Sequence, residues 1–279
     1  MEARKAKHGW IWTTLFSIIS VAWVFPIVLV VINSFKKKVY ISKKPFAIPT
    51  GKMFVGLENY VNGIKKTGLI SAFGWSVFIT VFSVAAIILF CSMTAWYITR
   101  VKSKVTSTIY YLCLFSMIVP FQMVMYTLSK IANMLKLGNP VGIIVVYLGF
   151  GAGLSVFMFT GFCKSIPIEI EEAAMIDGCN PLQTFFRVVM PIMKPTCITV
   201  TILQAMWIWN DYLLPSLVLD QKKYKTIPIA VQYLKGGYGS VDMGAMMGVL
   251  VIAIVPIIIF YIACQRYIIE GVVAGAVKG

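Results

Sequence analysis

The chain has 279 residues, of which 59% are hydrophobic and only 13% are charged. A soluble domain carries about 25% charged residues, so this composition excludes an ordinary soluble protein and indicates a membrane protein. The net charge of +15 does not call for a nucleic acid partner, because the basic residues lie in loops between apolar runs, where anionic lipid headgroups attract them.

Six apolar stretches are long enough to cross a membrane, since about 20 helical residues span a hydrocarbon core of about 30 Å. Their length and aliphatic content favour helices over the short alternating strands of a membrane barrel. The sequence therefore predicts an all-α integral membrane protein with a single transmembrane domain over residues 10–279. The predicted spans cover residues 10–35, 73–98, 105–128, 140–163, 196–219 and 245–267.

Residues 1–9 form a charged tail that looks like the start of a signal peptide. The apolar run after it is too long for such a peptide and has no small-residue cleavage site, so we expect a retained first span. The polar stretch 36–70 is expected to cap one face of the membrane. Four predicted spans contain a proline near their middle or outer part, which kinks a helix and suits a path that opens and closes, although prolines are common in membrane helices. They are Pro26, Pro120, Pro215 and Pro256.

The sequence predicts no resident metal, cofactor or enzyme chemistry. The six cysteines have no metal-ligand spacing and are expected to be small buried hydrophobes. The nucleotide-binding pattern G-x-x-x-x-G-K-[ST] is missing. The one histidine, His8, lies in the tail.

Residues 165–195 form a short, acidic, soluble-looking segment between the fourth and fifth predicted spans. Ser165 and Pro167 predict the start of one helix, and Gly178 is placed to end it in a left-handed cap. Asn180-Pro181-Leu182-Gln183 predicts the start of a second helix with a capping box, which Pro191 and Pro195 are expected to end. Two short helices with a tight turn could serve as a docking device, or could simply connect two spans.

Within this segment, Glu172-Ala173-Ala174, then Asp177-Gly178, and, after nine intervening residues, Val188-x-Met190-Pro191 resemble the EAA loop of binding-protein-dependent ABC importers. In that family the loop is a cytoplasmic coupling helix that sits in a cleft of the ATP-hydrolysing subunit. The resemblance implies a type I ABC importer permease that couples to its ATPase through Glu172, Ala173, Ala174, Asp177, Gly178 and Pro191.

Other motifs resemble the carbohydrate branch of the same family. They are Asn33-Ser34-Phe35-Lys36, Gly56-Leu57-Glu58-Asn59-Tyr60, Trp209-Asn210-Asp211-Tyr212 and the ending 271–279. The last two resemble the shorter permease of maltose-type importers, whose C-terminal tail reaches the ATPases. This implies that Gly275 and Lys278, in the tail 268–279, contact the ATPases. By itself such a small-residue tail would be read as a frayed end.

The family implies the remaining partners. They are a second permease, two ATPase subunits that bind ATP and magnesium, an extracytoplasmic solute-binding protein and a carbohydrate. It also implies a location in the cell membrane with both termini cytoplasmic. The charge bias of the loops leans the other way, with 11 basic residues on the predicted inner side and 14 on the outer, whereas inner loops are normally richer in them.

Asp211 is the only acidic residue inside a predicted span, and an ionisable group in the membrane is a functional candidate. With Trp209 and Asn210 it could contact a sugar, which offers apolar faces and a rim of hydroxyls. Gln122 and Gln204 are weaker candidates for the translocation path. The alternatives are an interfacial aromatic belt and a network that packs helices together.

A stand-alone ion-coupled transporter or channel is the alternative function. Such proteins usually contain internal repeats, broken helices or buried ionisable relays. One intramembrane acid and no evident repeat disfavour it.

Overall fold

The computed structural model describes residues 9–234 and 241–276, and side chains up to Tyr267. Within this part of the chain most residues are helical, and an antiparallel bridge pairs Lys36 with Phe54. The predicted all-α class is confirmed.

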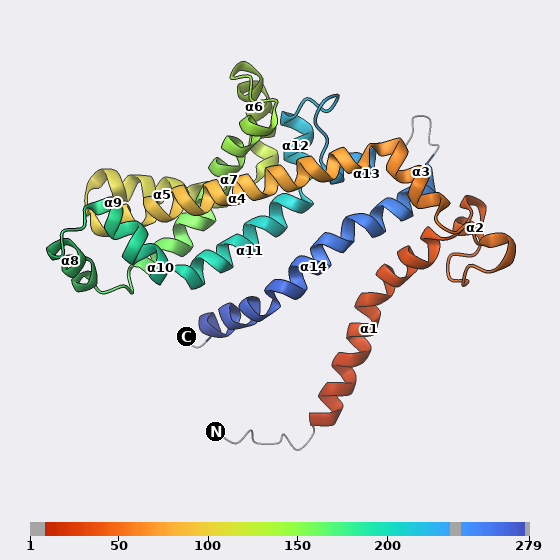
Figure 1. The fold of residues 1–279 in the computed structure, drawn as a ribbon, viewed down its shortest axis with the longest axis horizontal. Coiled ribbons are helices and arrows are strands. Elements are labelled where there is room, and N and C mark those ends of the chain that lie inside the picture. The colour runs from red at the N-terminus through yellow and green to blue at the C-terminus, as the bar shows by residue number, and fades with distance from the viewer. Residues whose placement is uncertain (1–8, 235–240, 277–279) are drawn as a thin grey trace. The chain divides into compact units, whose positions relative to one another are not determined.

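The chain forms two compact units, Met1–Leu69 with Ala230–Pro256 and Ile70–Ile229 with Ile257–Gly279. The described helices are shown in Figure 1. In the first unit they are α1 (Gly9–Ser34), α2 (Lys38–Lys43), a 3₁₀ turn (Gly51–Met53) and α3 (Glu58–Thr67). The second contains α4 (Leu69–Arg100), α5 (Lys104–Ile118), α6 (Phe121–Met134), α7 (Pro140–Cys163), α8 (Ile168–Ile176), α9 (Pro181–Thr184), a π-helical turn (Phe185–Val189), α10 (Met190–Ile192), α11 (Lys194–Asn210) and α12 (Leu213–Val218). Helices α13 (Ile227–Gln232) and α14 (Met243–Ala276) continue from one unit into the other.

Four of the described helices are long and apolar enough to cross a membrane, at Gly9–Ser34, Leu69–Arg100, Pro140–Cys163 and Met243–Tyr267. They coincide with the first, second, fourth and sixth predicted spans. Two bent helix pairs raise the number to six if each pair is one span. The number of crossings therefore stays a prediction.

The third predicted span, 105–128, is not one helix. Helix α5 ends at Ile118, α6 begins at Phe121, and the two are bent by 110°. Proline disfavours helical geometry in the residue before it, and Val119 is extended, with φ −74° and ψ 115°. Pro120 thus breaks the span rather than kinking it.

The fifth predicted span, 196–219, is also discontinuous. Helix α11 ends at Asn210, and Asp211 has an extended backbone before α12 begins at Leu213. At its other end, α11 is bent by 77° from the stretch Pro181–Ile192. Pro215 lies in the first turn of α12, four residues after Asp211, and a proline there cannot donate to the Asp211 carbonyl.

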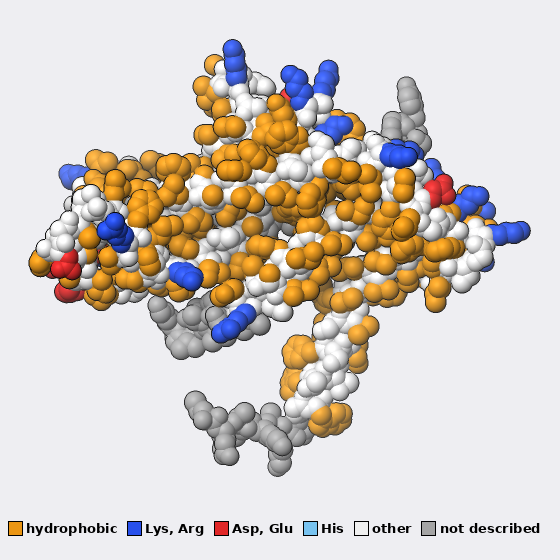
Figure 2. Space-filling view, in the orientation of Figure 1, with side chains coloured by type: hydrophobic (Ala, Val, Ile, Leu, Met, Phe, Trp, Pro, Cys, Tyr) orange, Lys and Arg blue, Asp and Glu red, His pale blue; other side chains and the backbone are white. Residues whose placement is uncertain are grey.

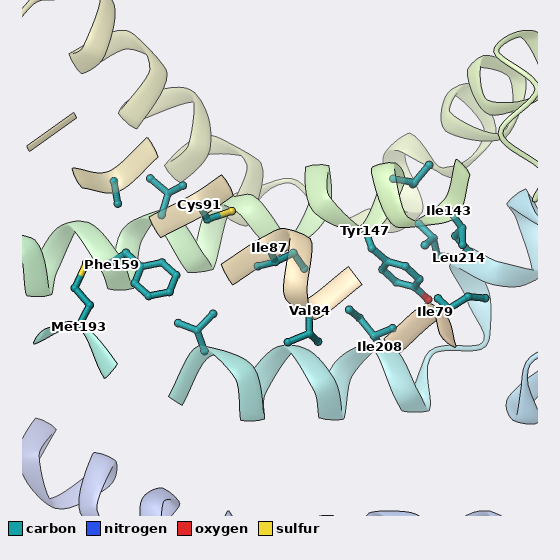
Figure 3. Close-up of a cluster of buried hydrophobic side chains, with 14 of the residues drawn as sticks. Ile79, Val84, Ile87, Cys91, Ile143, Tyr147, Phe159, Met193, Ile208 and Leu214 are labelled. Atoms are coloured by element: carbon teal, nitrogen blue, oxygen red, sulfur yellow. The ribbon is translucent and has the colours of Figure 1, made fainter. Parts of the chain in front are cut away.

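The core of the second unit is built around α7, which packs against α5 and α11. Tyr147 and Phe159 on α7 are fully buried, as is Ile87 on α4 (Figure 3). Helices α5 and α7 approach closely at Gly153, where an added Cβ would lie 2.6 Å from the Ser116 hydroxyl oxygen. Small residues of this kind let membrane helices pack backbone to backbone.

Two of the motifs quoted above meet in the first unit. The Lys36 ammonium is fully buried and donates to Asn33 Oδ1, at 3.0 Å, and to the carbonyls of Lys44 and Pro45. The Asn59 amide donates to the carbonyls of Ser34 and Lys36, both at 2.8 Å. These bonds fasten the end of α1 to the start of α3, which gives both motifs a structural role.

Candidate coupling site

The predicted helix-turn-helix is present in the second unit. Helix α8 ends in a Schellman motif, in which Gly178 has φ +86° and the Cys179 N–H donates to the Ala174 carbonyl at 3.0 Å. A residue with a side chain would be strained at this φ. Asn180 and Gln183 then form the predicted capping box at the start of α9. The local backbone of the turn is therefore fixed by its own sequence.

Both outer ends of the predicted segment differ from expectation. Ser165 does not cap α8, because its hydroxyl donates to the Phe162 carbonyl, and Pro167 takes the N-cap position. The second helix does not end at Pro191 but continues to Ile192 through the π-helical turn. Proline lacks an N–H and its ring crowds the carbonyl four residues back, and the wider turn immediately before Pro191 accommodates this locally.

Helix α8 has one buried face and one exposed face. Glu171 and Ala174 are buried, with 2% and 8% of their surface exposed, whereas Glu172, Ala173 and Ile176 are exposed. Residues three and four apart lie on the same side of a helix. Of the two adjacent glutamates, Glu171 therefore anchors the helix and Glu172 is available to a partner.

Glu171 is held by two side chains from the last turns of α4. The Arg100 guanidinium donates to Glu171 Oε1 through Nε at 2.9 Å and through Nη2 at 2.6 Å. The indole N–H of Trp96 donates to Oε2 at 2.9 Å, and Arg100 also donates to the Ile166 carbonyl at 2.9 Å. Charge-assisted bonds of this kind are stronger and more directional than neutral ones. They tie the start of α8 to the end of α4.

The second half of the segment is anchored to α4 as well. The ring of Trp96 lies 5.4 Å from that of Phe185, which is fully buried in the π-helical turn. Val189 and Met193 are also fully buried, and Met193 contacts the Cys163 thiol at 3.6 Å. One residue of α4, Trp96, thus contacts both halves of the segment, so that α4 and the segment are positioned to move together.

The outer surface of the segment combines apolar and acidic side chains. Ile176 is 86% exposed, Leu182 57% and Met175 47%. Acidic side chains gather at the same end of the unit, near α8 (Figure 2). Exposed apolar patches flanked by polar residues mark protein interaction sites. We call the exposed residues Glu172, Ala173, Met175, Ile176 and Leu182 the coupling surface.

The other predicted coupling residues are divided between surface and interior. Asp177, Gly178 and Pro191 are exposed, whereas Ala174 faces the interior. Gly275 lies in α14, in a stretch where only the backbone is described, and Lys278 lies outside the described residues.

The predicted path residues do not form one surface. Gln204 is buried, and its amide donates to Ser155 Oγ at 3.0 Å and to the Gly151 carbonyl at 3.3 Å, so it joins α11 to α7. Gln122 is exposed at the start of α6. Asn210 is exposed and donates back to the Met206 carbonyl of its own helix.

Asp211 forms a structural network at the break in the fifth span. Its Oδ2 accepts from the Tyr147 hydroxyl at 3.1 Å, and its Oδ1 accepts from the backbone N–H of Leu213 at 2.9 Å. It therefore caps α12 and links it to α7. Trp209 packs edge-on against Phe73, with ring centroids 5.9 Å apart. This geometry matches the helix-packing alternative for Asp211.

Sequence reasoning did not single out Arg100, Trp96 or Glu171 as functional residues. Arg100 was visible only as part of a short basic turn after an apolar run. Its partner lies 71 residues further along the chain, and a single sequence does not show such pairings.

Helix composition and apolar length define a multi-pass membrane protein. Residues 87–273 match the family described as binding-protein-dependent transport system inner membrane component. The chain belongs to this family. It is a membrane permease subunit of an ABC importer, in which ATP hydrolysis is the task of partner subunits.

The chain is similar to named permeases over nearly its whole length. It is 38% identical to the probable starch degradation products transport system permease protein AmyC of Thermoanaerobacterium thermosulfurigenes, covering 95% of this chain and 96% of that protein. It is 32% identical to the multiple sugar-binding transport system permease protein MsmG of Streptococcus mutans, covering 99% of each.

A solved structure shares the fold. It is a bacterial ABC transporter involved in the import of the acidic polysaccharide alginate, with a TM-score of 0.76, 22% identity and coverage of 96% of this chain and 99% of that one.

Proposed function

We propose that this chain forms half of the translocation path of an ATP-driven carbohydrate importer and couples to an ATPase through the coupling surface. The substrate class is supported by its relatives, whose names refer to starch degradation products and multiple sugars. The requirement for an external solute-binding protein is supported by the description of the family. A second permease and two ATPase subunits, with ATP and magnesium bound to the ATPases, complete the assembly.

The observation that carries the coupling proposal is that Glu171 is buried whereas the adjacent Glu172 is exposed. Glu171 is buried against Arg100 and Trp96, so α8 is held firmly against the end of α4. Glu172 faces outward beside exposed Met175 and Ile176. An ATPase groove with a basic residue could take the apolar side chains and pair with this carboxylate.

The mechanism follows from these contacts. ATP binding closes the ATPase dimer and displaces the segment that sits in it. Because Trp96 and Arg100 bind the segment directly, α4 moves with it, and the path changes its exposure from one side of the membrane to the other. Such two-state coupling transfers energy only if the partner binds the two states differently.

This proposal fixes the orientation. The end of the second unit that carries α8 faces the cytoplasm, where ATP is available, and both termini are cytoplasmic. The proposal takes precedence over the count of basic loop residues, 11 on the inner side and 14 on the outer. The excess of basic residues on the outer side comes from the stretch 36–70. One of those lysines, Lys36, is buried and donates to carbonyls, so its ammonium is engaged inside the protein and is not exposed on the surface of that loop.

Co-purification with the partners tests the proposal. The chain is co-expressed with candidate ATPase and permease subunits, and ATPase retention and sugar uptake are measured. We expect Glu172→Lys to reduce both without lowering the thermal stability of the chain, because Glu172 is exposed. Glu58→Lys, the same charge reversal at an exposed residue of α3, is the control and is expected to leave both unchanged. Sugar uptake by the chain alone, as an ion-coupled transporter would show, contradicts the proposal.

A further inference from the structure

A pocket of about 570 Å³ lies in the second unit beside, but separate from, the coupling surface. The ends of α4, α5 and α7 and the first residue of α8 line it. The lining residues that bear on its chemistry are Arg100, Lys102, Thr106, Tyr110, Thr160 and Lys164.

The pocket lies where apolar helices end. Helix α4 ends at Arg100, α7 ends at Cys163 and α5 begins at Lys104. Helices of this length and hydropathy end at the boundary between hydrocarbon and water. The pocket is therefore at the level of the lipid headgroups, and this holds whichever side of the membrane it faces.

The lining of the pocket is positively charged. Its three cationic residues are accompanied by no acidic residue among the described residues that line it. Arg100 is engaged by Glu171, which leaves Lys102 and Lys164 to supply the uncompensated charge. The Lys164 ammonium lies 5.8 Å from the centre of the Tyr110 ring, an arrangement that holds a lysine in place while its charge stays available.

A buried hydroxyl lacks a partner in the same pocket. Thr160 is 3% exposed, and its Oγ1 makes no hydrogen bond with any described residue. A buried polar group without a partner is costly and calls for an explanation, such as a ligand that completes its bonding. A phosphate oxygen would accept from this hydroxyl.

The amino end of α5 favours an anion on its side of the pocket. Thr106 and the neighbouring Ser107 lie in the first turn of α5, whose amino end carries positive partial charge. The carboxyl ends of α4 and α7 have the opposite sign, but their partial charges are smaller than the full charges of Lys102 and Lys164.

From these observations we propose that this pocket binds a phosphate group carried by an anionic membrane lipid. Basic pockets between membrane helices at headgroup level suit anionic headgroups. The apolar side chains next to it suit acyl chains, since Leu112 and Phe115 on α5 are 62% and 61% exposed. A free phosphate would need only the polar part of this lining. The site does not depend on the ATPase docking proposed above.

Thermal unfolding of the purified full chain in neutral detergent tests the site. Three additives are compared, namely short-chain phosphatidylglycerol, short-chain phosphatidylcholine and inorganic phosphate. The variants are Lys102→Gln with Lys164→Gln, and Thr160→Val. Lys130→Gln with Lys136→Gln removes the same charge at two exposed lysines outside the pocket and is the matched control.

Phosphatidylglycerol is expected to stabilise the wild type and the control pair most. Its affinity should fall about 25-fold in the pocket pair, since each lysine near an anionic headgroup contributes roughly a fivefold factor. Thr160→Val should bind phosphatidylglycerol more weakly than the wild type. Native mass spectrometry, which counts lipids only on folded protein, should show less retained phosphatidylglycerol in the pocket pair.

Two results would overturn the proposal. Equal loss of affinity in the control pair would mean that general surface charge attracts the lipid. Equal stabilisation by inorganic phosphate would mean that the site does not select a lipid.

Discussion

Removing the charge of Glu171 should loosen the segment 165–195 without changing the residues of the coupling surface. In Glu171→Gln, Arg100 keeps its charge but loses the carboxylate that it pairs with. The side chains of Glu171 and Arg100 are only 3% and 18% exposed, so water compensates little of the loss.

The size of the effect follows from the contacts. Glu171 accepts two hydrogen bonds from Arg100 and one from Trp96. Breaking a buried ion pair by neutralising one partner costs about 3–5 kcal/mol. Glutamine retains one acceptor oxygen, so we expect the lower end, about 3 kcal/mol.

The assay is thermal unfolding of the purified chain together with the number of ATP molecules hydrolysed per sugar imported by the complex. Glu171→Gln should lower the unfolding temperature and raise the number of ATP molecules consumed per sugar. Glu169→Gln, a neutralisation at an exposed glutamate of the same helix, should change neither. Equal behaviour of the two variants would refute the anchoring role of Glu171.

Three further predictions concern the structure outside this anchor. Asp211→Ala should cost about 1 kcal/mol because α12 loses its cap, and Asp211→Asn should cost less in the same unfolding assay. An added Cβ at Gly63 would lie 2.6 Å from the Val249 side chain, so Gly63→Ala should destabilise by about 1–3 kcal/mol, whereas Gly161→Ala, with open space around it, should stabilise slightly. Burial of Asp242 opposes its ionisation, but the hydrogen bonds from Lys66 and the Ala245 N–H, together with the positive charges of Lys66 and Lys38, outweigh burial and lower the pKa of Asp242. Asp242→Asn should therefore cost under about 1 kcal/mol at neutral pH, and the difference should vanish as the pH falls through that lowered pKa.

Local sequence signals predicted the coupling segment well. Gly178 adopts the left-handed conformation, and Asn180 with Gln183 forms the capping box. Such motifs depend on residues only a few positions apart, so a single sequence contains them fully. The apolar runs located the long helices for the same reason.

Features set by distant contacts were not predictable. Apolar residues occur on both faces of α8, so periodicity did not distinguish the buried Glu171 from the exposed Glu172. Pro120 predicted a kink in the third span. It did not predict a bend of 110°, because the angle depends on what each half of the span packs against. Asp211 looked like a candidate for sugar contact because an acid inside an apolar stretch is unusual. The sequence does not show that the helix breaks at this residue, so it does not show that Asp211 caps α12.

The central claim is that the coupling surface transmits to this permease the conformational change that ATP drives in the ATPase subunits. Its most direct test is sugar-stimulated ATP hydrolysis by the complete complex in liposomes that contain the solute-binding protein. With Glu172→Lys, we predict that stimulation by sugar is largely lost while the chain remains folded and inserted. Full stimulation in this variant, matching the Glu58→Lys control, would contradict the claim.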